Sequence, residues 1–413
     1  MSAPPSRLRL AVALDGAGWH PAAWREPNAR PGDLLKPGYW AGLVQEAEAG
    51  LLDFVTIEDS LSIQTDSPFG TEDDDRNDRV RGRLDAVLIA SRIAPLTRHI
   101  GIVPTAVVTH TEPFHLSKAI ATLDYVSRGR AGVRVQVAPR PRDAALFGRR
   151  EFPEISYAAL GSPEGQELIR EAFAEAADYI EVLRRLWDSW EDDAEIRDVA
   201  TGRFIDRDKI HYIDFEGRYF NVKGPSITPR PPQGQPVVAA LAHRTAPFKS
   251  VPFELVGTSA DIGFVTPRTA ADIASITAEI RAAQDAAGRG TDTVHVFGDI
   301  VVLLDETEQA ARERLARLDE AAGAAYESDA LVFAGTPEDL ADLLATWHAA
   351  GLSGFRLRPA VLPDDLEQIT RRLVPELQRR GLFHDAYDAA TLRGALGLPR
   401  PTSRYATTEG TPA

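Results

Sequence analysis

The segment IGIVPTAVVTHTEPFHLSKAIATLDYVSRGRAGVRVQVA, residues 100–138, predicts a strand, a helix and a second strand in direct succession. Ile100–Ala106 is a short apolar run, as expected for a buried strand. Pro113–Val126 has apolar residues at helical spacing and begins with proline, which is well tolerated in the first turn of a helix. Ala131–Ala138 is the second strand. Two strands joined through a helix indicate a parallel pair.

The same alternation extends over most of the chain. Further strands are expected at residues 8–14, 54–57, 237–241, 262–265, 294–304 and 354–357. Helical patterns are found at residues 39–49, 84–94, 166–190, 270–287, 307–326, 337–350 and 366–380. Eight strands, nearly all followed by a helix, predict an α/β protein with a (β/α)8 TIM barrel and insertions after strand 4. An open doubly wound sheet is the alternative, but its G-x-G-x-x-G motif is incomplete in DGAGWH, residues 15–20.

The domain organisation follows from where this alternation stops. We expect one barrel over residues 1–400, interrupted by an insertion at about 139–235. The insertion begins with an Arg-, Pro- and Gly-rich stretch, and it contains a hairpin pattern at 209–222 with Glu216 and Gly217 at the turn. Residues 401–413 form a polar C-terminal tail.

Composition excludes several classes of protein. Asp and Glu number 61 against 46 Lys and Arg, a net charge of −15, which argues against binding nucleic acid or an anionic membrane surface. The absence of cysteine excludes disulfides, thiolate zinc sites and cysteine-ligated iron–sulfur clusters. No signal peptide or apolar span is recognisable, so a cytoplasmic protein is expected. The acidic run Glu72–Asp75 is read as a solvated loop, and no metal site is expected.

Candidate functional residues are sought where each barrel strand ends, because active sites of such barrels lie at the C-terminal ends of the strands. His20 follows the first strand, and Glu58 and Asp59 follow the second. Adjacent strand residues point to opposite faces, so only one of these two carboxylates can face the barrel axis. Thr105 and His110 come at the end of the third strand. The two histidines are candidates for acid–base or substrate-orienting roles, because their pKa lies near neutral pH.

The fourth strand carries polar residues between valines. If the valines pack outward against helices, Arg134 and Gln136 point into the barrel. A buried arginine needs an anionic partner. That partner is either Glu58 or Asp59, in a structural ion pair, or it is a phosphate or carboxylate of a ligand.

Several motifs together resemble the luciferase-like flavin-dependent monooxygenases, in the branch of nitrilotriacetate and dibenzothiophene-sulfone monooxygenases. The resemblance covers nearly the whole chain. The motifs that carry it are WHP (19–21) with WR (24–25), PFHL (113–116), ATLDYVSRGRAG (121–132), LWDSW (186–190), PPQG (231–234) and VPELQRRGLF (374–383).

The resemblance implies a barrel that uses reduced, exchangeable FMN and O2 to oxygenate a small organic substrate. It also implies a separate flavin reductase as partner and, on the resemblance alone, a homodimer. Asp59 and Thr105 match the family and would flank the flavin ring, and Arg134 would reach the flavin or the substrate. The deazaflavin F420, which related barrels use, is a further option for the cofactor.

Three customary flavin contacts are altered in this chain. The family's Trp-Asn pair is replaced by Val133-Arg134, with Ala138-Pro139 at the strand end, and its Arg-Tyr pair is replaced by Ala172-Phe173. The family's phosphate-binding Gln-Ala-Gly-x-Ser is replaced by the longer ALAHRTAPFKS, residues 240–250. In one interpretation Arg244 and Thr245 hold the phosphate instead, at a helix N-terminus. In the other, flavin binding has been lost, and the chain is a non-catalytic partner subunit or performs non-redox chemistry on an anionic substrate.

Overall fold

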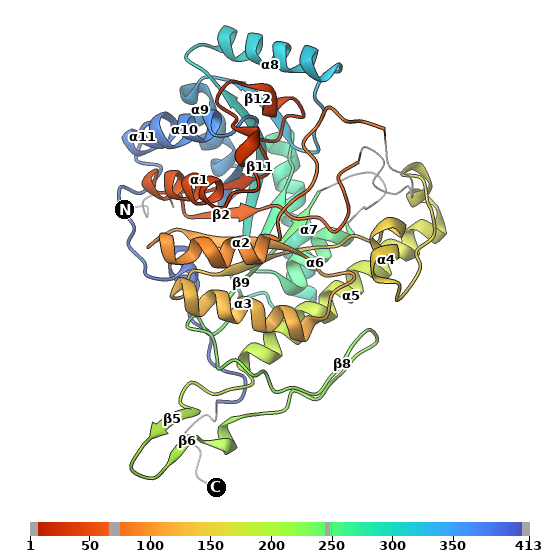
Figure 1. The fold of residues 1–413 in the computed structure, drawn as a ribbon, viewed down its shortest axis with the longest axis vertical. Helices are drawn as coiled ribbons and strands as arrows, with labels where there is room; N and C mark the ends of the chain where they lie inside the picture. The colour runs from red at the N-terminus through yellow and green to blue at the C-terminus, as the bar shows by residue number, and fades with distance from the viewer. Residues whose placement is uncertain (1–6, 66–74, 244–247, 249, 407–413) are drawn as a thin grey trace.

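The structure is a computed structural model that describes residues 7–65, 75–243, 248 and 250–406. Eight parallel strands close into a barrel in the order β1, β2, β3, β4, β9, β10, β11 and β13, and β13 pairs again with β1 (Figure 1). Their bounds are β1 Arg9–Leu14, β2 Phe54–Ile57, β3 Gly101–Val107, β4 Gly132–Gln136, β9 Val237–Ala242, β10 Ile262–Val265, β11 His295–Leu304 and β13 Gly354–Pro359. The predicted (β/α)8 barrel is confirmed. The doubly wound alternative is wrong, because β10 pairs with β11 and β13 pairs with β1, so the ring of eight strands is closed.

Helices surround the barrel. The larger ones are α1 Pro37–Ala49, α2 Ala86–Ile93, α3 Pro113–Ser127, α5 Pro163–Asp188, α6 Val251–Ser259, α7 Ala270–Ala286, α8 Glu308–Ala322 and α9 Pro337–Ala349. The helix expected at 366–380 is divided into α10 Asp364–Gln368 and α11 Val374–Arg379 by one π-helical turn. Strand β12 Leu331–Gly335 and the short helix α4 Pro141–Phe147 were not expected, and helix α6 was implied only by the helix N-terminus to which the phosphate was assigned. Strand β12 pairs with β11 outside the closed ring. No helix in the described part of the chain is long and apolar enough to cross a membrane.

The barrel interior is apolar at the N-terminal ends of the strands and polar near their C-terminal ends. At the N-terminal ends of the strands, Phe54, Phe264 and Phe297 pack against one another with ring centroids 5.5 to 6.2 Å apart. Leu392 and Leu396, in and beside the short helix α12 Leu392–Ala395, close this end. The polar side chains therefore lie above a sealed apolar layer, near the C-terminal ends of the strands.

The segment between β4 and β9 leaves the barrel and returns to it. After α4 and α5 come two hairpins, β5 Glu195–Asp198 with β6 Arg203–Ile205, and β7 Phe215–Glu216 with β8 Asn221–Val222. Both extend away from the barrel (Figure 1). Only the second was expected. Of the polar tail, the described part packs on this segment, because Arg404 pairs with Glu181 and Asp188 of α5.

Candidate active site

A cavity of about 360 Å³ opens at the C-terminal ends of the barrel strands. Its volume lies within the range of about 300–1,000 Å³ that is typical of small-molecule sites. The apolar residues of its lining include Val137, Phe173, Leu241, Phe248 and Leu255. The charged residues of its lining are Glu58, Arg134, Arg140, Asp329, Arg356 and Arg358, and His243 lines it as well. We call this cavity the central pocket.

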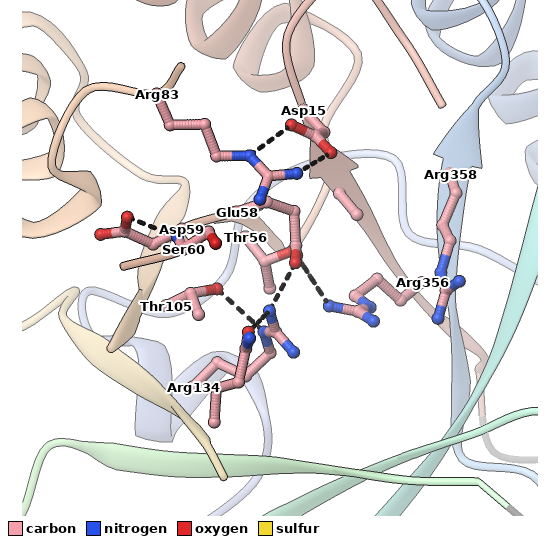
Figure 2. Close-up of polar contacts among 12 residues, drawn as sticks. Asp15, Thr56, Glu58, Asp59, Ser60, Arg83, Thr105, Arg134, Arg356 and Arg358 are labelled. Carbon is pink, nitrogen blue, oxygen red and sulfur yellow. Dashed lines mark hydrogen bonds and ion pairs between the residues drawn. The ribbon is translucent and has the colours of Figure 1, made fainter. Parts of the chain in front are cut away.

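Buried ion pairs form the floor of the central pocket. Glu58 lies between Arg134 and Arg356 and accepts hydrogen bonds from both, the second over 3.3 Å (Figure 2). Arg134 also donates through Nε to Thr105 Oγ1 over 2.9 Å and through Nη2 to Gln136 Oε1 over 3.0 Å. The parallel register explains the first of these contacts, because Thr105 of β3 lies directly opposite Arg134 of β4. Burial lowers the pKa of Arg134 to about 10, against the opposing effect of Glu58, so the guanidinium remains charged at neutral pH.

Asp299 continues this network toward the opposite wall. Its carboxylate is fully buried and accepts from Arg356 Nε over 2.9 Å and from Arg358 Nε over 3.0 Å. Arg358 also donates through Nη1 to Asp329 over 2.6 Å. Burial by itself lowers the pKa of Arg358, but Asp299 and Asp329 raise it above its ordinary value. Each of these guanidinium groups is thus paired with carboxylates.

The structure decides between the two carboxylates expected after the second strand. Glu58 faces the axis and is the partner of Arg134. Asp59 faces away, where its carboxylate accepts from Ser60 N over 2.7 Å and from Ala86 N, at the start of α2, over 3.0 Å. Burial raises the pKa of Asp59. The inward orientation of Arg134 and Gln136 is confirmed, whereas Asp59 does not line the central pocket and its contact with flavin stays a prediction.

The two histidines proposed for acid–base roles lie outside the lining of the central pocket. His20 Nδ1 accepts from Ala22 N over 3.1 Å, and Nε2 lies 3.0 Å from Asp319 Oδ1. Both ring nitrogens are therefore engaged in local contacts, and burial lowers the pKa of the ring. His110 Nε2 lies 3.2 Å from the carbonyl oxygen of Ala138, and its ring lines a neighbouring cavity of about 270 Å³. Their catalytic roles stay predictions.

Sequence reasoning missed two arginines that line the pocket and the buried carboxylate that pairs with them. Asp299, Arg356 and Arg358 were not singled out, although the alternation Arg-Leu-Arg within a strand is the same signal that identified Arg134. His243 is the histidine that lines the central pocket within the described ranges, and its Nδ1 lies 3.5 Å from Asp329 Oδ2. Arg244 and Thr245, the expected phosphate ligands, lie outside the described residues, as do Glu72, Asp73 and Asp74 of the acidic run. No cluster of potential metal ligands occurs among the described side chains.

The residues present fit a flavin mononucleotide, which combines a flat aromatic ring with an anionic tail. The aromatic and aliphatic residues of the lining suit the flat ring, and its arginines suit the anionic tail. Four positions that the resemblance assigns to altered flavin contacts, Arg134, Ala138, Pro139 and Phe173, all line this pocket. Thr105 does not line the pocket itself but accepts a hydrogen bond from Arg134, which does. The positions changed in sequence are therefore neighbours in space.

Known proteins resemble this chain over nearly its whole length. The family model described as luciferase-like monooxygenase matches residues 21–330. The chain is 29% identical to N-acetyl-S-(2-succino)cysteine monooxygenase of Bacillus subtilis (strain 168), covering 98% of this chain and 100% of the relative. It is also 29% identical to nitrilotriacetate monooxygenase component A of Aminobacter aminovorans, covering 97% and 98%. Among solved structures, EDTA monooxygenase from Chelativorans sp. BNC1 superposes with a TM-score of 0.79 at 22% identity, covering 95% of this chain and 99% of that one.

Proposed function

Because the chain belongs to the luciferase-like monooxygenase family and is therefore a flavin-dependent monooxygenase, we propose that its cofactor is reduced FMN, bound in the central pocket. The observation that carries this proposal is the convergence of the altered flavin-contact positions on one cavity at the C-terminal ends of the strands. When bound, reduced FMN supplies the electrons with which O2 is activated to oxygenate a small organic substrate. A separate flavin reductase, as the resemblance implies, would supply the reduced cofactor.

The protein's own part is to bind, orient and exclude water. Phe173, Leu241 and Phe248 form an apolar wall for a flat ring, and they displace water from the reacting groups. Arg134 is fixed by Glu58, Thr105 and Gln136, so its position on the floor is set before any ligand binds. For the phosphate we retain Arg244 and Thr245 as proposed ligands; they precede α6 in the sequence, and backbone amides at a helix N-terminus favour an anion.

We assign proton transfer to His243. Its ring lines the central pocket and contacts Asp329, and Arg358 in turn holds Asp329. Burial favours the neutral form of Asp329, but Arg358 lowers its pKa well below the ordinary value. The carboxylate is thus an anion beside the imidazole, 3.5 Å from its Nδ1. We further propose a homodimeric, cytoplasmic enzyme, as the resemblance implies.

Anaerobic calorimetric titration of the purified protein with reduced FMN tests the cofactor proposal, with oxidised FMN and F420 titrated alongside. Reduced FMN is expected to bind most tightly, at one equivalent per chain. A preference for F420 would overturn the choice of FMN. No heat from any of the three would contradict flavin binding and favour a partner subunit or a flavin-free reaction.

A pocket-filling variant ties the binding to the central pocket. Leu241→Trp places a larger ring in the cavity and is expected to abolish flavin binding, because Leu241 lines the apolar wall. Leu88→Trp is the matched control, since Leu88 is 69% exposed on α2. Equal flavin affinity in the two variants would show that flavin binds elsewhere.

A further inference from the structure

We propose that Arg140 binds an anionic oxygen group, a phosphate or a carboxylate, of a ligand in the central pocket. This inference rests on the proposed function of that pocket, but it concerns a residue that neither the resemblance nor the sequence pattern selects. It follows from the charges of the pocket and from which of them are already paired.

Arg140 is placed at the pocket by the end of β4. The strand ends at Gln136, and Ala138 and Pro139 continue along the cavity wall. The backbone then turns, with Arg140 N donating to Ala138 O over 2.8 Å, and α4 begins at Pro141. The side chain of Arg140 lines the same cavity as the floor arginines.

The other pocket arginines all have carboxylate partners. Arg134 pairs with Glu58, Arg356 with Glu58 and Asp299, and Arg358 with Asp299 and Asp329. Three guanidinium groups thus face three carboxylates, and their charges cancel. Arg140 is a fourth cation. Among the described residues, these four arginines and three carboxylates therefore carry a net charge of about +1.

Within the described part of the chain, the Arg140 side chain makes no hydrogen bond and no ion pair. Asp143 attracts it and Arg83 repels it at longer range, but neither lies within ion-pair distance. Arg83 is itself paired with Asp15. Burial lowers the pKa of Arg140, yet a guanidinium keeps its charge under such conditions. The guanidinium donors of Arg140 therefore have no protein partner among the described residues.

A guanidinium in this state is suited to a bidentate anion. Its planar fork matches the two oxygens of a carboxylate or a phosphate, and the apolar residues of the same pocket weaken competing solvation. The two candidate sources are the phosphate of the flavin and a carboxylate of the substrate. Both offer the same chemistry to Arg140, and the experiment distinguishes them.

Arg140→Gln removes the charge and keeps a polar side chain. Arg149→Gln is the control, because Arg149 belongs to the same segment, is 61% exposed and pairs with Glu112. Each variant and the unmodified protein is titrated anaerobically with reduced FMN and with reduced riboflavin, which lacks the phosphate. The FMN-loaded protein is then titrated with succinate, and the flavin-free protein with inorganic phosphate.

If Arg140 binds the flavin phosphate, Arg140→Gln weakens FMN binding by about 10- to 100-fold, the effect of losing a charge-assisted hydrogen bond. Riboflavin binding is then unchanged. If Arg140 binds a substrate carboxylate, FMN binding is unchanged and succinate binding weakens by the same factor. Unchanged affinity of Arg140→Gln for FMN, succinate and phosphate alike would overturn the inference. Failure of the unmodified protein to bind any flavin, with phosphate binding still dependent on Arg140, would instead refute the proposed function alone.

Discussion

Asp299 holds together the floor of the central pocket, so its replacement by asparagine is the sharpest test of the buried ion network. Asp299→Asn removes a charge while keeping nearly the same shape. The carboxylate accepts four hydrogen bonds, two from Arg356 and two from Arg358, and is completely buried. Asparagine presents one oxygen and one amide donor, so at least one guanidinium would face an N–H group.

The expected loss of unfolding free energy depends on which carboxylate partners Arg356 and Arg358 keep. Removing one partner of a buried ion pair costs about 3–5 kcal/mol, because the other charge stays buried without compensation. Arg356 keeps Glu58 at 3.3 Å, and Arg358 keeps Asp329 at 2.6 Å, so both cations retain one carboxylate. We therefore expect the lower end of the range, about 3 kcal/mol, which is about a 100-fold change in the folding equilibrium.

The assay is urea denaturation followed by tryptophan fluorescence, with the midpoint of thermal unfolding as a second measurement. Asp342→Asn is the control, because Asp342 is 73% exposed in its ion pair with Arg380 and should change stability by less than about 1 kcal/mol. A loss of unfolding free energy below about 1 kcal/mol for Asp299→Asn would show that the buried carboxylate is not needed to hold the two arginines.

Two further predictions concern titratable groups. Burial raises the pKa of Asp53 from 3.8 to about 6, so its favourable contribution to stability is present below about pH 4 and is lost as the pH rises through 6. The asparagine of Asp53→Asn does not titrate. The unfolding free energy of this variant, relative to that of the unmodified protein, should therefore increase between pH 4 and pH 7 by at most about 3 kcal/mol. A difference in unfolding free energy that stays constant over this pH range, measured by urea denaturation, would contradict the prediction. His243→Asn should lower kcat by about 100-fold or more, with flavin affinity kept. An unchanged kcat would exclude His243 as the proton-transfer residue.

The barrel could be predicted because its signals are local. Each strand and helix depends on the periodicity of its own residues, and eight repeats of the same unit leave few topologies. The first hairpin of the insertion escaped prediction because its strands, Glu195–Asp198 and Arg203–Ile205, are short and mostly polar. The bounds of helix α6 were not predicted, because the helix follows a loop, within residues 240–250, that is longer than the corresponding loop of the family.

The pocket floor was predictable only in part. Alternation with valines indicated that Arg134 faces inward. The sequence did not show which of Glu58 and Asp59 faces the barrel axis, because that depends on the exact residue at which β2 ends. Asp299 and Arg356 lie 57 residues apart and meet because β11 and β13 are neighbours in register. Sequence order gives no sign of that pairing, since β12 intervenes in the chain. His20 was chosen for its loop position, and nothing in the sequence indicated Asp319 as its partner.

The central claim is that this protein controls the reaction of reduced flavin with O2. The most direct measurement mixes anaerobic reduced FMN with oxygenated buffer in a stopped-flow spectrometer, with and without saturating protein, and follows flavin reoxidation. We expect the protein to change the time course, the change to saturate at one chain per flavin, and Leu241→Trp to abolish it. Reoxidation identical to that of free flavin at every protein concentration would show that the protein does not act on reduced flavin.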